Sequence, residues 1–117
     1  MRKMVPSELK GIRIDQTIIQ VDKTGWGLTD AGGVNYFFKA VDITDLGIRD
    51  GDIVILSPGN TLSDFDSLTM QAIKDGLLLT LDGNNTIHCE SLVNPSTYQN
   101  QISALEIQIT IFRHSTL

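Results

Sequence analysis

Two neighbouring residues, His88 and Cys89, have side chains that could form a thiol–imidazole pair of the kind that cysteine hydrolases use. They lie in an alternating stretch, "NTIHCES", that predicts a β-strand. Because adjacent side chains of a strand point to opposite faces, the thiol and the imidazole could not touch there. We therefore expect Cys89 to be a small core residue and His88 a solvated one, and we predict no catalytic residues.

Metal ions and cofactors are also not predicted. Four aspartates could in principle offer oxygen ligands to calcium, but their spacing is not that of an EF-hand, and turn formation explains each of them. The Gly-Trp-Gly and Gly-Gly stretches match neither a phosphate loop nor a dinucleotide-binding pattern. With a single cysteine, the chain has no intrachain disulfide and no cysteine-based zinc site. The four aspartates are Asp42, Asp45, Asp50 and Asp52.

Aromatic residues in or near loops are the candidates for recognition. Trp26 lies between Gly25 and Gly27. An exposed ring there could stack on a sugar or anchor an interface, whereas a buried ring would be part of the core under a tight loop. Both interpretations remain open. Tyr36 and Tyr98 are weaker candidates of the same kind, the latter in the polar stretch "NPSTYQNQ".

The bulk composition excludes several classes of partner. The 117 residues carry nine basic and fourteen acidic side chains, a net charge of −5, with no cluster of Lys and Arg. This balance opposes binding to a phosphate backbone, so we predict no nucleic-acid partner. The longest aliphatic runs, 53–56 and 77–79, are far short of the roughly 20 residues that cross a bilayer. The N-terminal "MRKMVPSELKGIRI" lacks the apolar segment of a signal peptide, and we predict no membrane insertion.

Alternation of apolar and polar residues dominates the chain and predicts β-strands. In "ISALEIQITIFR" the leucine and three isoleucines share one face, and Phe112 falls on the otherwise polar face. Phe112 is therefore either a second small contact or part of a subunit interface. Residues 77–91 predict a hairpin with its turn at Asp-Gly-Asn-Asn. Further strands are predicted at 16–22, 35–43 and 52–57, the last with apolar residues on both faces, as in a central strand covered on both sides.

One segment has helical rather than strand periodicity. In "TLSDFDSLTMQAIKD", Phe65, Leu68, Ala72 and Ile73 follow helical spacing, and Ser63 could cap the start. The sequence thus predicts an all-β fold, an antiparallel β-sandwich of jelly-roll or Ig-like type. It would have about 7–8 strands and one short helix or helical turn near 63–74. Residues 1–11 are expected to form an N-terminal arm and residues 12–117 a single domain.

The stretch from Asp45 to Asn60, "DLGIRDGDIVILSPGN", invites comparison with two other kinds of protein. A self-cleaving peptidase of the repressor or signal-peptidase type would need a nucleophilic serine just before the Gly-Ile pair and a lysine base downstream. Here Asp45-Leu46 precede Gly47-Ile48, so the nucleophile is lacking. The swapped-hairpin DNA-binding barrel is opposed by the acidic balance of the chain.

A third resemblance extends further along the chain and depends on the order of its features. The stretch "VDITDLGIRDGD" leads to an aliphatic strand closed by Ser-Pro, then to a segment around Phe65 and to "QAIKDG". A hairpin with the return arm "NTIHCES" follows, then Pro95 and the alternating strand "ALEIQITIF". From about Phe37 to Arg113 this order resembles a compact β-sandwich domain found at the ends of bacteriophage fibre, head-fibre and tail-associated proteins.

The resemblance implies a non-enzymatic virion protein, assembled in the host cytoplasm, that decorates the capsid or forms a fibre or tail tip. Members are commonly displayed as trimers, so it also implies a homotrimer in contact with other virion proteins, with host-surface glycans as a further candidate ligand. The arm would attach the domain to the particle. The alternative is a free-standing carbohydrate- or protein-binding β-sandwich module of bacterial origin. The contact residues to examine are Trp26, Tyr36, Tyr98 and Phe112.

Overall fold

The chain folds as an antiparallel β-sandwich with one short α-helix, as the alternating sequence predicts. The computed structural model describes residues 12–58, 68–98 and 104–114, and these form seven strands. The expected arm (1–11) and the expected cap and first helical turn around Ser63 and Phe65 lie outside the described residues. No helix in the described part of the chain is long and apolar enough to cross a membrane.

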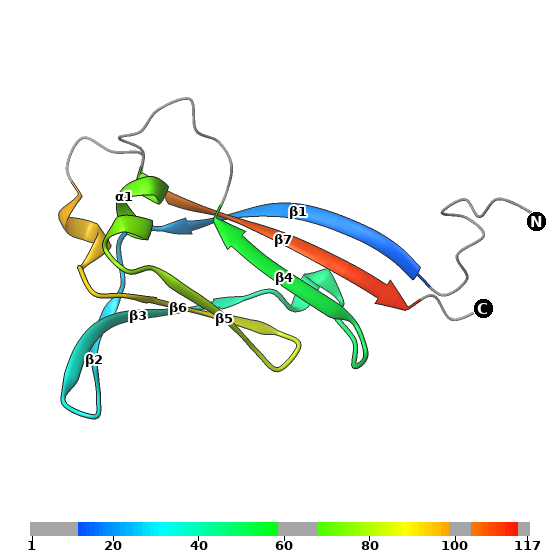
Figure 1. Cartoon of the computed structure of the whole chain (residues 1–117), viewed down its shortest axis with the longest axis horizontal. Helices are drawn as coiled ribbons and strands as arrows, with labels where there is room; N and C mark the ends of the chain where they lie inside the picture. The colour runs from blue at the N-terminus through cyan, green and yellow to red at the C-terminus, as the bar shows by residue number, and fades with distance from the viewer. Residues whose placement is uncertain (1–11, 59–67, 99–103, 115–117) are drawn as a thin grey trace, which may run out of the picture.

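The strands divide into two sheets, which Figure 1 shows as two layers that diverge toward one end. Sheet A has the order β1-β7-β4, and sheet B has the order β2-β3-β6-β5. The strands of sheet A are β1 (Ile12–Asp22), β7 (Ala104–His114) and β4 (Ile53–Pro58). Those of sheet B are β2 (Gly27–Ala31), β3 (Val34–Asp42), β6 (Thr86–Ser91) and β5 (Leu78–Asp82).

The core lies between the sheets and is built on the alternation of β7. Four of its residues, all on the face toward sheet B, are no more than 1% exposed. From sheet B, Ile87 and Cys89 on β6 face them and are fully buried. The predicted hairpin is confirmed, with Leu79 paired to Cys89 and Leu81 to Ile87. The four β7 residues are Leu105, Ile107, Ile109 and Ile111.

One predicted position in the sheet is wrong. The apolar run of β4 favoured a central strand covered on both sides, but β4 pairs with β7 alone and forms an edge of sheet A. Val54 and Leu56 pack against the core, whereas Ile53 and Ile55 are 62% and 51% exposed. Because sheet B covers only one face of sheet A, the apolar side chains on the other face of β4 stay exposed among the described residues. Pro58, which cannot donate to a ladder, fits an edge strand.

A short strand that the sequence patterning did not indicate, β2, pairs with β3. Ala31 and Val34 are register partners, and Gly32 and Gly33 form the connection between them with φ of +63° and +86°. Positive φ at both central residues is the requirement of a type I′ hairpin turn, which glycine meets without strain. The Gly-Gly pair was the available signal for this hairpin.

The helix α1 (Leu68–Lys74) joins the two sheets near the start of β7. Leu68 and Ala72 are fully buried, as their spacing predicts, while Ile73 is 40% exposed and does not share the buried face. The hydroxyl of Thr69 accepts a hydrogen bond from the Glu106 amide at 3.1 Å. This bond satisfies a backbone donor of β7 where β4 no longer pairs with it.

Candidate functional site

The residues that suggested thiol chemistry do not come together. Cys89 is fully buried on the inner face of sheet B, and its register neighbours place His88 on the opposite face. Burial raises the pKa of the Cys89 thiol to about 12, although the charge of Lys39 acts in the opposite direction. The thiol is therefore protonated at neutral pH and is packed as a core residue.

His88 makes its contacts on the outward face of sheet B. Its Nε2 lies 3.1 Å from Oδ2 of Asp82. Its ring meets that of Phe38 edge to face, with the centroids 4.9 Å apart. The imidazole thus covers part of an aromatic ring and pairs with a carboxylate, which accounts for its position without a catalytic partner.

Three of the four aspartates that could have held calcium accept hydrogen bonds in turns instead. Oδ1 of Asp42 accepts hydrogen bonds from the amide and the hydroxyl of Thr44. Oδ2 of Asp52 accepts from the Arg49 amide at 2.9 Å. Oδ1 of Asp50 accepts from the side chain of Asn84, which links the turn before β4 to the β5–β6 turn. Within the described residues, no three acidic, His or Cys side chains gather as a metal ion would require.

Trp26 occupies the core, which is the second of its two interpretations. Its side chain is 7% exposed, and its Nε1 donates to the Asp22 carbonyl at 2.9 Å. The Nζ of Lys39 donates to the Thr24 carbonyl at 2.7 Å in the same loop. Gly25, with φ of +82°, allows the tight turn between these contacts. The loop that carries the chain from sheet A to sheet B is thus closed over the indole, and no ring is presented to solvent there.

The two tyrosines are placed differently from each other. Tyr98 is 8% exposed, and its hydroxyl donates to Oδ2 of Asp75 at 2.6 Å. Burial, together with this carboxylate, raises the pKa of the phenol far above its ordinary value. Tyr36 is half-buried on β3, opposite Thr29 of β2. Tyr98 anchors the segment after β6 to the end of α1.

Phe112, the remaining candidate, lies on a continuous surface that we call the outer face of sheet A. The register places alternate residues of the three strands on this face, away from sheet B. From β1 it has residues 12, 14, 16, 18 and 20, and from β4 residues 53, 55 and 57. From β7 it has Ala104, Glu106, Gln108, Thr110, Phe112 and His114, and Asp22 at the end of β1 completes it.

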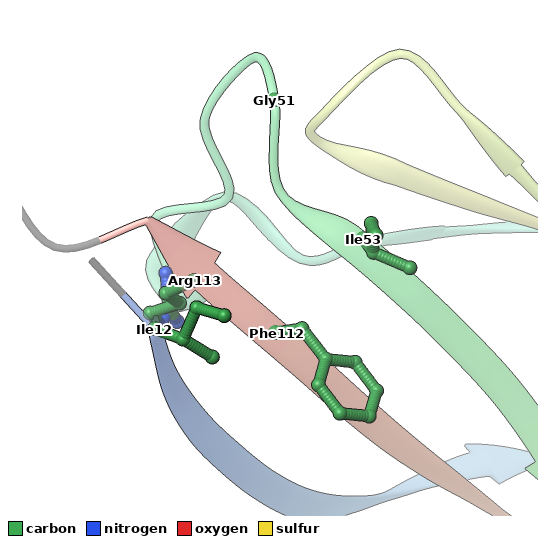
Figure 2. A pocket seen from close by; sticks show the side chains of 5 residues that line it. All are labelled: Ile12, Gly51, Ile53, Phe112 and Arg113. Carbon is green, nitrogen blue, oxygen red and sulfur yellow. The ribbon is translucent and has the colours of Figure 1, made fainter. Parts of the chain in front are cut away.

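The apolar side chains of this face gather at one end. Ile14, Phe112 and Ile53 are direct register partners and form one row across the three strands. Ile14 is 58% exposed and Ile53 62%. Figure 2 shows the Phe112 ring on β7 between Ile12 from β1 and Ile53 from β4. These residues, with Gly51 and Arg113, line a shallow pocket of about 160 Å³. Ile12, Ile18 and Ile55 extend the apolar surface and are each more than half exposed.

Charged side chains occupy the inner face directly behind this apolar end. Arg113 is only 12% exposed, and its Nε donates to Oδ2 of Asp15 at 2.5 Å. Its other nitrogens donate to the carbonyls of Leu46 and Gly47, and Nη1 lies 3.8 Å from Oδ2 of the buried Asp52. The hydrogen bond from Arg113 holds the pKa of Asp15 below its ordinary value. Here, then, the usual arrangement of an antiparallel sheet, with apolar residues inside and polar residues outside, is reversed.

Because these apolar side chains are exposed to water, covering the outer face of sheet A would be energetically favourable. Full burial of an isoleucine side chain is worth about 1.5–3 kcal/mol, and the five isoleucines of this face are roughly half exposed. Covering them would therefore add on the order of 1 kcal/mol each. The sequence indicated Phe112 alone; the period-two spacing of Ile12, Ile14 and Ile18 was the signal for the rest.

No protein-family model, curated protein or solved structure matches this chain.

Proposed function

We propose that this chain is a non-enzymatic structural module that acts by binding protein surfaces through the outer face of sheet A. The observation that carries the proposal is the row formed by Ile14, Phe112 and Ile53 on one side of the sheet, in which the two isoleucines are exposed and the phenylalanine between them is partly buried. A contiguous apolar surface of this kind is typical of an interaction site in a soluble protein.

The resemblance in sequence makes the proposal more specific. We propose that the module belongs to a bacteriophage particle, where it decorates the capsid or forms a fibre or tail tip as a homotrimer. An assembly role accommodates an apolar surface that an isolated protein would leave in water. An assembly role also needs no reactive thiol, and Cys89, the candidate nucleophile, is buried and has a raised pKa.

The glycan-binding alternative depended first on Trp26, and the described surface does not favour it. The indole is enclosed by its own loop and donates to the Asp22 carbonyl, so it offers no stacking surface. A glycan array with wild-type protein would test the alternative directly. Specific binding at micromolar protein would revive it and would require a surface other than the Trp26 loop.

The proposed virion role is tested by the content of purified particles and by the genes beside the one that encodes this chain. We expect portal, capsid or tail genes as neighbours, and we expect the chain in particles at a fixed copy number by quantitative mass spectrometry. Particles without the chain, together with neighbours of unrelated function, would contradict the virion role.

A further inference from the structure

We infer that the outer face of sheet A is the surface through which copies of this chain meet. In this arrangement the rows of Ile14, Phe112 and Ile53 from the copies face a common axis. The inference rests on the proposed trimeric role and assigns that role a surface.

The shape of the apolar end fits a copy of itself. The pocket beside Phe112, with its volume of about 160 Å³, is close in size to cavities that accept one aromatic ring. It opens between Ile12 and Ile53, on the same face that carries the Phe112 ring. One face thus offers both exposed apolar side chains, Ile14 and Ile53, and an apolar depression that a side chain from another copy can fill.

The distribution of charge favours a copy over a charged partner. Two of the three ionisable residues that the register places on this side, Asp22 and Glu106, pair with Ala104 and Gln20 at the end of the sheet away from Phe112, and the third, His114, pairs with Ile12 at the other end of β7. The remainder of the face is Ala, Ile, Gln, Ser, Thr and Phe, and no Asp, Glu, Lys or Arg lies on it between Glu106 and Phe112, although 20% of the whole chain is charged. Two molecules of net charge −5 repel each other, and a face with no charge at its centre lets them approach with the least penalty.

The size of the face is that of a small interface. β1 and β7 have eleven residues each and β4 has six. At about 3.3 Å per residue and about 4.8 Å between strands, they present about 450 Å² per copy. Two copies that cover each other's face would together bury about 900 Å², which is below the range of about 1,200–2,000 Å² of stable pairwise interfaces and agrees with association in the micromolar range.

Two matched lysine substitutions test the inference. Ile14→Lys introduces a charge into the outer face of sheet A, and Leu78→Lys introduces the same charge on the outward side of sheet B. The two residues are 58% and 55% exposed, and both lie on edge strands. Sedimentation equilibrium from about 1 to 100 µM would measure association of the wild type and of both variants. Far-UV circular dichroism would verify that each variant is folded.

We expect an oligomeric wild type, at least about tenfold weaker association of Ile14→Lys, and a change of less than about twofold for Leu78→Lys. Ile53→Lys, at 62% exposure on β4, serves as a second variant if Ile14→Lys does not fold, with the same expected loss. A monomeric wild type would overturn the inference, and so would equal association of all folded variants.

The mass of the oligomer, measured in the same experiment, distinguishes a wrong surface from a wrong number of copies. A dimer that Ile14→Lys dissociates would uphold the surface and contradict the proposed trimer. A trimer indifferent to both Ile14→Lys and Ile53→Lys would uphold the trimer and overturn the surface.

Discussion

The outward faces of the two sheets are built from antiparallel strands of similar kind, yet they differ in where their charges lie. On sheet B, the row of Phe38, Glu90 and Leu78 combines aromatic, acidic and aliphatic side chains, and the next row contains His88. On sheet A, the row of Ile14, Phe112 and Ile53 near one end has no polar side chain in it.

The difference teaches that exposure alone does not identify an interaction surface. Leu78 is as exposed as the isoleucines of sheet A, but it stands beside Glu90, and Phe38 is partly covered by the His88 ring. On sheet A the charged residues have turned inward, where Arg113 and Asp15 pair. What distinguishes the outer face of sheet A is therefore the joint presence of apolar residues outside and an ion pair inside.

The largest effect on the free energy of unfolding is expected from replacing Arg113, which lies on the inner face of sheet A behind the row of Ile14, Phe112 and Ile53. Arg113→Met would leave the buried Asp52 carboxylate and the carbonyls of Leu46 and Gly47 without this donor. Loss of one partner from such a buried network costs about 3 kcal/mol. Urea unfolding at neutral pH would measure the change in the free energy of unfolding.

Arg13→Met is the matched control, because Arg13 also reaches Asp15, at 3.0 Å, but is 68% exposed. An exposed pair of this kind contributes less than about 1 kcal/mol. If the two variants lost equal stability, the inward network could not be what supports the apolar end of sheet A.

A smaller effect is expected on the outward face of sheet B. His88→Ala removes the edge-to-face contact with Phe38 and the pairing with Asp82. We expect a loss of about 1 kcal/mol in unfolding free energy and no change in association. Urea unfolding and sedimentation of the same sample would measure both. Dissociation of the oligomer by His88→Ala would place sheet B, rather than sheet A, at the interface.

The smallest effect is a difference in pH dependence between wild type and Asp15→Asn. Because Arg113 holds the folded pKa of Asp15 below its ordinary value of 3.8, the ionised carboxylate stabilises the fold above pH 3.8. This contribution is lost as the pH falls through the folded pKa. We therefore expect the stability advantage of the wild type over Asp15→Asn to be constant near pH 6 and to shrink below about pH 4.

Urea midpoints measured along this pH series provide the readout. Asp22 and Asp42 also have lowered pKa values, from hydrogen bonds with Thr24 and Thr44, but they are present in both proteins and cancel in the difference. An advantage that grew toward low pH would contradict the role assigned to Asp15.

Much of the sandwich could be predicted from local patterns. The alternation of Leu105, Ile107, Ile109 and Ile111 predicts the buried face of β7, and the spacing of Leu79, Leu81, Ile87 and Cys89 predicts the β5–β6 hairpin. These patterns are informative because side-chain direction alternates strictly along a strand, and each strand must bury its apolar face.

The arrangement of the strands between and within the sheets was harder to predict. β4 carries apolar residues on both faces, and in sequence this is indistinguishable from a strand covered on both sides. Only the pairing order shows that β7 is central and that Ile53 and Ile55 are left uncovered. The burial of Trp26 likewise depends on a loop contact with Asp22 that no strand pattern encodes. Long-range pairing, rather than local propensity, thus determines the candidate site.

The most direct test compares the two outward faces in wild-type protein by hydroxyl-radical footprinting. Phe112 on sheet A and Phe38 on sheet B are both partly buried within one chain, so each serves as the reference for the other. If copies meet through the outer face of sheet A, oxidation of Phe112 should fall severalfold as protein concentration rises from about 1 to 100 µM, while oxidation of Phe38 stays constant. Equal oxidation of Phe112 across this range, or protection of Phe38 instead, would contradict the assignment.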